Sequence, residues 1–164
     1  MEIITDQQLT AADKSQLGRL LHACFGEMEF EIGPQATIRA ILRAGNGIVA
    51  HAAVSIRQID LHTSEEEIAV LGLVCVEPSE RGKGFGYQVI QSLHGSLRMP
   101  FLLNCGRGLV PYYEKIGYKE ISACASYFRD GKTVIDTDPV LLYENGISIL
   151  TDMRNWPIYI GTDF

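Results

Sequence analysis

Residues Ile68 to Leu93 read IAVLGLVCVEPSERGKGFGYQVIQSL, and they organise the rest of the chain. The part up to Val76 is a continuous apolar run, which predicts a β-strand that is buried on both faces. The glycines between Arg81 and Gly86 allow the backbone to come close to a ligand. A segment with helical spacing follows, and a helix start presents unpaired N–H groups and a positive dipole end. Together these elements predict an anion site, with phosphate as the expected ligand.

The bulk composition is that of one ordinary globular domain covering residues 1–164. No apolar segment is long enough to span a bilayer and no signal peptide is evident, so we expect a cytoplasmic location without membrane contact. With 14 basic and 20 acidic residues the formal charge is −6, which argues against a nucleic-acid partner and suits a cationic substrate. Four scattered cysteines (Cys24, Cys75, Cys105 and Cys124) disfavour structural zinc and a disulfide framework, so no metal is expected.

The remaining patterns predict alternating strands and helices. The expected strands cover 1–5, 38–44, 48–59, 68–76, 100–105, 118–128, 139–143 and 147–150, and the expected helices cover 9–25, 85–97 and 111–116. Turns are expected at Asn46-Gly47, which suits a type I′ hairpin, at residues 62–64 and 130–131, and at Asn145-Gly146.

Three kinds of phosphate loop compete for the glycine segment. A Walker loop needs Ser or Thr after Gly82-Lys83, where this chain has Gly84. A dinucleotide fingerprint needs a different glycine spacing in an opening βαβ unit. The third pattern, R-x-x-G-x-G between a buried strand and a helix, is met by Arg81, Gly84 and Gly86.

This loop is followed, about one strand and one helix later, by PYYEKIGY at residues 111–118. The pairing resembles the GNAT superfamily of acyl-CoA-dependent N-acyltransferases. The resemblance implies an α/β (α+β) fold, with a mixed, mostly antiparallel central sheet of about seven strands flanked by helices. GIVAHAAV (47–54) and TDMR (151–154) are similar to the aminoglycoside 2′-N-acetyltransferase branch, whose relatives include the nodulation-factor N-acyltransferases.

The resemblance also implies roles for individual residues. Backbone groups of the strand end would hold the pantetheine arm, and the N–H groups of the glycine loop would hold the diphosphate. The implied cofactor-binding set is Val74, Cys75, Val76, Arg81, Gly82, Lys83, Gly84, Phe85, Gly86, Tyr87 and Asn104. Asn104 is equally compatible with a structural role at its strand end. Tyr113 occupies the general-acid position, because a phenol with a pKa of about 10 keeps its proton at neutral pH. Tyr112 lies on another helix face and is expected at the core or rim.

The general base is left open by the sequence. The aminoglycoside branch carries a glutamate in its central strand, whereas residues 68–76 contain no acid. The acids at 65–67, Asp152 and the carboxylate of Phe164 are alternatives, and His51 is expected to be structural. Glu27, Glu29 and Asp152 are candidate substrate-binding acids.

The leading hypothesis is an acetyl-CoA-dependent N-acetyltransferase, with acetyl-CoA as donor and a small amine, such as an amino sugar or polyamine, as acceptor. One alternative is transfer to a protein or peptide. The other is a non-catalytic acyl-CoA sensor, which the missing strand glutamate favours and Tyr113 opposes. Relatives suggest that a homodimer is possible.

Overall fold

The computed structural model describes residues 1–26, 37–60, 65–121, 124–129, 132–147 and 157–162. Its helices are α1 (Ala11–Phe25), α2 (Phe85–Ser96) and α3 (Val110–Ile116). Its strands are β1 (Glu2–Thr5), β2 (Thr37–Ala44), β3 (Gly47–Asp60), β4 (Glu65–Val76), β5 (Phe101–Asn104), β6 (Lys119–Ile121), β7 (Cys124–Arg129), β8 (Lys132–Asp136), β9 (Val140–Tyr143) and β10 (Pro157–Thr162).

The strands form a seven-stranded sheet in the order β1-β2-β3-β4-β5-β9-β6 and a three-stranded sheet in the order β10-β7-β8. In the larger sheet the β4–β5 pair is parallel, and the β1–β2, β2–β3, β5–β9 and β6–β9 pairs are antiparallel. This confirms the predicted mixed, mostly antiparallel sheet of seven strands with flanking helices.

The chain divides into two compact units, which are described separately below. Unit 1 consists of Met1–Ser55 and Leu71–Leu97, and unit 2 consists of Ile56–Val70 and Arg98–Phe164. The long strands β3 and β4 contribute residues to both units. That residues 1–164 fold and act as a single domain stays a prediction.

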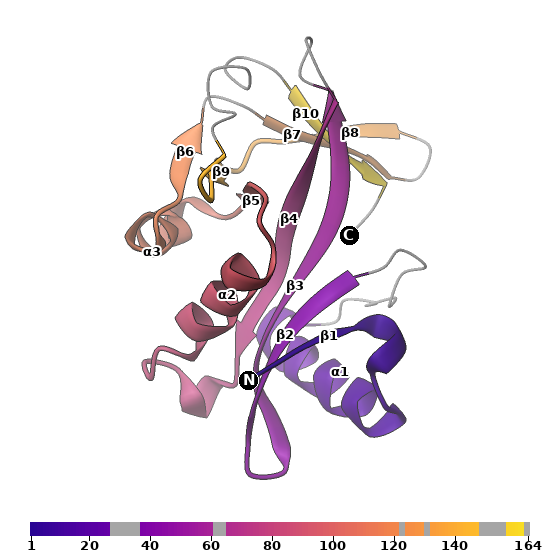
Figure 1. Cartoon of the computed structure of the whole chain (residues 1–164), viewed down its shortest axis with the longest axis vertical. Coiled ribbons are helices and arrows are strands. Elements are labelled where there is room, and N and C mark those ends of the chain that lie inside the picture. Colours follow the sequence, from indigo (N-terminus) through magenta and orange to yellow (C-terminus); the bar gives the residue numbers. More distant parts are fainter. Residues whose placement is uncertain (27–36, 61–64, 122–123, 130–131, 148–156, 163–164) are drawn as a thin grey trace. The chain divides into compact units, whose positions relative to one another are not determined.

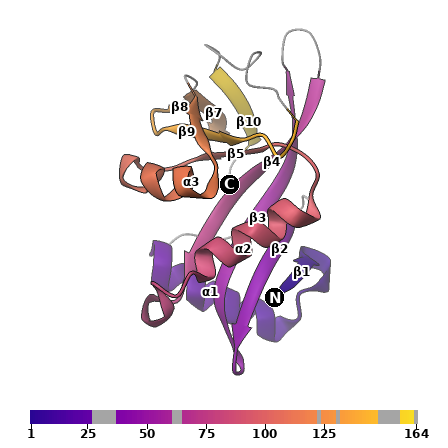
Figure 2. The same cartoon turned by 60° about the vertical axis from the view of Figure 1, so that its left-hand side comes forward.

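In unit 1, α1 and α2 lie on opposite faces of the strands (Figures 1 and 2). Leu17, Leu20 and Leu21 of α1 pack with Ile41 of β2 and Cys75 of β4 in one buried cluster. On α2, the side chains at positions 89, 90 and 93 are fully buried. Both helices therefore bury the apolar face that their spacing predicts.

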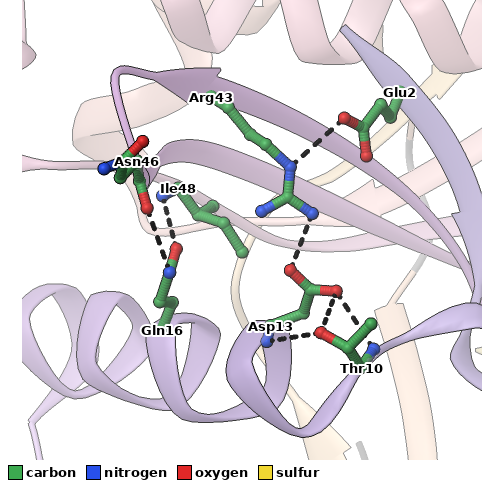
Figure 3. Close-up of polar contacts among 7 residues, drawn as sticks. All are labelled: Glu2, Thr10, Asp13, Gln16, Arg43, Asn46 and Ile48. Atoms are coloured by element: carbon green, nitrogen blue, oxygen red, sulfur yellow. Dashed lines mark hydrogen bonds and ion pairs between the residues drawn. The ribbon is translucent and has the colours of Figure 1, made fainter.

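The start of α1 is tied to the first two strands by a polar cluster (Figure 3). Thr10 is the N-cap: its Oγ1 accepts the Asp13 N–H at 3.1 Å, and Asp13 Oδ2 accepts the Thr10 N–H at 3.0 Å. Asp13 Oδ1 also accepts from the Arg43 guanidinium of β2 at 2.7 Å, and Arg43 Nε donates to Glu2 of β1 at 3.2 Å. One carboxylate thus caps the helix and joins it to the sheet.

The β2–β3 hairpin differs from its prediction by one position. Ala44 pairs with Gly47, so the two turn residues are Gly45 and Asn46. Only Gly45 has a positive φ, of 57°, which is the type II′ pattern instead of type I′. Gln16 of α1 clamps this turn: its Nε2 donates to Asn46 O at 3.0 Å and its Oε1 accepts the Ile48 N–H at 3.1 Å (Figure 3).

The core of unit 2 is built on β5 and β9, whose apolar residues are almost fully buried. Phe101 pairs with Tyr143 in the ladder, and their rings meet edge to face with centroids 6.4 Å apart. The predicted strand over 118–128 is wrong as one element, because its residues form β6 in the larger sheet and β7 in the smaller one. The strands β8 and β10 were not predicted: β8 pairs antiparallel with β7, which directly precedes it, and β10 pairs in parallel with β7 from a distant part of the sequence.

Candidate active site

The part of β4 that belongs to unit 1 contains a residue with a left-handed backbone, Leu73, three residues before the strand ends. Leu73 has φ = 52°, a conformation that costs a non-glycine residue about 1–2 kcal/mol. Its carbonyl accepts a hydrogen bond from His51 Nδ1 at 2.9 Å. The strand then continues through Val74 and Cys75, two of the predicted pantetheine contacts. The regular pleat is therefore broken directly before the residues expected to meet the cofactor.

The Val76 carbonyl is already engaged. It accepts from Cys24 Sγ of α1 at 3.4 Å and from Arg81 Nε at 3.3 Å. A carbonyl oxygen has two lone pairs, so both acceptor positions are used. Arg81 also approaches Cys24 Sγ at 3.7 Å, which directs its guanidinium toward α1 and the strand end.

The glycine loop leads into an uncapped helix. Gly82 and Gly84 have φ values of 81° and 78°, and a Cβ built on either would meet no atom within 4 Å. Gly84 is the N-cap of α2, and in the described structure no side chain caps this end. The first α-helical bond in this turn is Gln88 N to Gly84 O at 3.1 Å, so the N–H groups of residues 85–87 precede the helical ladder. An open helix start with several N–H groups is the kind of end at which proteins bind phosphate, and the diphosphate site at this loop stays a prediction.

Charged and aromatic side chains surround the loop. Lys83 Nζ forms an ion pair with Glu80 Oε2 at 2.7 Å and stays more than half exposed. Tyr87, in the first turn of α2, is 49% exposed. The cation next to the loop is therefore held by a carboxylate and remains accessible to a ligand from solvent.

Tyr113 lies in unit 2, on the buried side of α3. Its side chain packs edge to face against Tyr118, with ring centroids 5.7 Å apart, and against Tyr112 at 5.1 Å. Burial raises the pKa of Tyr113, and the nearby Cys105 and Tyr112 raise it further. The phenol therefore stays protonated at neutral pH, which the general-acid role requires. Tyr112 is exposed, so it lies at the rim.

Asn104 is the last residue of β5, and its side chain forms a hydrogen bond with Asp136, which the sequence did not identify as a site residue. Its Nδ2 donates to Asp136 Oδ2 of β8 at 2.6 Å, and Asp136 Oδ1 accepts the Asp138 N–H at 2.9 Å. The carboxylate can only accept, so the amide orientation is determined and Asn104 Oδ1 points away from Asp136. No local pattern predicts this pair, because its members lie 32 positions apart.

His51 is fully buried and its two ring nitrogens are both engaged, by the Leu73 carbonyl and by Arg39. It therefore has no free lone pair with which to accept a proton from an amine, in agreement with a structural role. The other predicted acids, Glu27, Glu29, Asp152 and the carboxylate of Phe164, lie outside the described residues.

Solved structures share this fold. Escherichia coli ElaA matches with a TM-score of 0.64 and 18% identity, over 87% of this chain and 99% of that one. An acyl-CoA N-acyltransferase from Pseudomonas aeruginosa matches with a TM-score of 0.61 and 18% identity, over 86% and 96% of the two chains. An aminoglycoside 6′-N-acetyltransferase complexed with coenzyme A matches with a TM-score of 0.61 and 15% identity, over 88% and 97%.

The fold and the family together define the class of protein, an N-acyltransferase of the GNAT superfamily. The chain belongs to the nodulation protein A (NodA) family, whose model matches residues 2–140. This confirms the predicted superfamily, its nodulation branch and the assignment as an enzyme. A search of curated protein sequences found no match to this chain. Along the described part of the chain, no helix has the length and apolar character needed to cross a membrane.

Proposed function

We propose that this protein transfers an acyl group from an acyl-CoA thioester to a primary amine of a small molecule, and that residues 1–164 act as one catalytic domain. The acyl group is acetyl in the simplest case. The observation that carries the proposal is the open glycine loop at the uncapped start of α2, in a member of an N-acyltransferase class.

The phosphate end of the donor would lie on the loop. Gly82 and Gly84 leave space above the backbone, and the N–H groups of residues 85–87 lie at the positive end of the α2 dipole. Lys83 adds an exposed cation, although Glu80 shares its charge. In this proposal the loop and Lys83 contact only the diphosphate. They do not select the length of the acyl chain, which has to be measured.

The reaction is a direct displacement. The amine nitrogen attacks the thioester carbonyl carbon, the C–N bond forms, and the C–S bond breaks to release the CoA thiolate. Tyr113 supplies the proton that converts this thiolate into the thiol, because its phenol is protonated and buried. The amine enters unprotonated and, after its attack, its nitrogen loses a proton to water or a carboxylate. A proton returned from solvent then restores the Tyr113 phenol, so that the proton lost by the amine balances the one gained by the thiol.

The acceptor is proposed to be a cationic amine, such as an amino sugar or a polyamine. The formal charge of −6 favours the approach of cations. The acids at positions 27, 29 and 152 are the proposed contacts for the amine.

The experiment combines binding with turnover. Calorimetry with acetyl-, octanoyl- and palmitoyl-CoA measures donor affinity, and mass spectrometry detects N-acylated products from amino sugars, polyamines and peptides. We expect micromolar binding and a product with at least one small amine. Failure to bind any acyl-CoA would overturn the proposal. Binding without any product would instead identify a sensor, and products from peptides alone would identify a protein acyltransferase.

A further inference from the structure

Unit 1 contains a buried polar chain that ends at the left-handed residue of β4. Asp6 forms an ion pair with Arg39 Nε, and Arg39 Nη1 lies 3.1 Å from His51 Nε2. His51 Nδ1 lies 2.9 Å from the Leu73 carbonyl oxygen. His51 is 0% exposed and Arg39 is 3% exposed, so this is an interior network and not a surface feature.

The hydrogen bonds determine the form of the imidazole. The Leu73 carbonyl can only accept, so Nδ1 carries the hydrogen. Arg39 can only donate, so Nε2 is the acceptor and the ring is neutral. In agreement, burial first and the Arg39 charge second lower the pKa of His51 to about 3. His51 thus presents a permanent N–H donor to Leu73.

The imidazole N–H of His51 orients the Leu73–Val74 peptide group, which lies next to the residues expected to bind acyl-CoA. The described chain has no cis peptide bond, so the Leu73 carbonyl and the Val74 N–H point in opposite directions within one plane. The Leu73 carbonyl turns toward the His51 side chain, so the Val74 N–H turns away from it. Cys75 follows in the strand and is itself 4.0 Å from His51 Nδ1.

We propose that His51, held by Arg39 and Asp6, is a positioning residue for acyl transfer: it fixes the Leu73–Val74 peptide so that the Val74 N–H donates to the thioester oxygen as negative charge develops there. This inference rests on the proposed function. A fixed N–H aimed at a developing oxyanion acts on the transition state more than on the bound ground state. Removing the imidazole donor therefore lowers kcat and leaves donor affinity nearly unchanged.

The test compares three variants with the wild type. His51→Leu removes the donor, and His51→Asn keeps an amide N–H near the position of Nδ1. Ile41→Val is the matched control: Ile41 is directly opposite His51 in the β2–β3 ladder and fully buried, but lies outside the polar chain. We expect kcat to fall about 100-fold in His51→Leu, with the dissociation constant for CoA changed less than about threefold. His51→Asn should recover most of the rate, and Ile41→Val should retain it.

A second readout does not depend on turnover. The backbone amide resonance of Val74 should shift on addition of CoA thioester to the wild type, and should move in His51→Leu before any ligand is added. Unchanged Val74 resonances in folded His51→Leu would overturn the inference, as would an equal loss of kcat in Ile41→Val. If His51→Leu does not fold, His51→Gln, which retains a side-chain amide but moves it away from Nδ1, takes its place. A wild type that binds no acyl-CoA refutes the proposed function, whereas the Val74 comparison in the free protein still tests the positioning of the peptide.

Discussion

Asp13 Oδ1 lies 2.7 Å from a guanidinium nitrogen of Arg43, while the other oxygen of the same carboxylate accepts from Thr10. The hydrogen bond from the Thr10 side chain and then the one from Arg43 lower the pKa of Asp13 from 3.8 to about 2. A carboxyl group with a lowered pKa stabilises the fold above its ordinary pKa. This contribution is lost as the pH falls from about 4 through about 2.

We therefore expect Asp13→Asn to lower the thermal midpoint at pH 7, with a smaller difference from the wild type at pH 2. Thermal unfolding followed by circular dichroism between pH 2 and pH 7 measures this. Asp138→Asn is the control, because only the backbone N–H of Asp138 contributes a described hydrogen bond. A difference that stays constant down to pH 2 would show that the carboxylate charge is not responsible.

Gly84→Ala should weaken acyl-CoA binding by about tenfold, equivalent to about 1.4 kcal/mol. The cause is conformational, because φ is 78° and no atom lies within 4 Å of the added Cβ. Gly95→Ala, inside α2, is the matched control: its φ is not in the left-handed region, and it should leave affinity unchanged while stabilising the helix by up to about 1 kcal/mol. Calorimetry with CoA distinguishes the two. Equal affinities in both variants would remove the loop from the phosphate site.

Tyr113→Phe should lower kcat about 100-fold with little change in the affinity for acyl-CoA, because the ring remains and only the proton donor is lost. The raised pKa also predicts no loss of rate from ionisation of Tyr113 below pH 10. Steady-state rates from pH 6 to pH 10 test both expectations. Tyr112→Phe, on the exposed neighbour, should behave as the wild type. An unchanged rate in Tyr113→Phe would exclude it as the acid.

The Asn104–Asp136 hydrogen bond predicts that Asp136→Ala weakens cofactor binding. Without the carboxylate the amide can turn, so Asn104 Oδ1 no longer faces one direction. We expect a loss of about three- to tenfold in CoA affinity in both Asn104→Ala and Asp136→Ala, or about 1 kcal/mol. The double variant should be no weaker than either single one, because both remove the same contact. Additive losses would show that the residues act separately.

We expect the buried ring of His94 to make the stability of the fold depend on pH in a second pH range. Burial lowers the pKa of His94 from 6.5 to about 4, so the folded state holds the neutral ring. The unfolded state takes up the proton first, and stability therefore falls as the pH drops from about 6.5 to about 4. The slope is at most about 1.4 kcal/mol per pH unit for one group. Urea unfolding at pH 7 and pH 5 should show a smaller pH difference in His94→Gln than in the wild type. If the free energy of unfolding changes equally between pH 7 and pH 5 in His94→Gln and in the wild type, His94 is not the group responsible.

The sequence alone determined the elements whose patterns are local. The apolar run from Ile68, the glycines and the helix after them predicted β4, the loop and α2 because burial, left-handed φ and helical periodicity are properties of neighbouring residues. The family motif at Tyr113 was readable for the same reason. The hairpin turn was displaced by one residue because Gly45 and Gly47 both flank Asn46, and only strand pairing selects between them.

Only the tertiary structure decided which distant groups meet. The division of 118–128 between two sheets, the Asn104–Asp136 pair and the chain from Asp6 through Arg39 and His51 to Leu73 all join residues far apart in sequence. Such contacts depend on strand order and register, which local propensity does not encode. The acid-free part of β4, residues 68–76, thus contacts a buried histidine of β3 through the Leu73 carbonyl, and this contact follows from the pairing of strands and not from the sequence of either one.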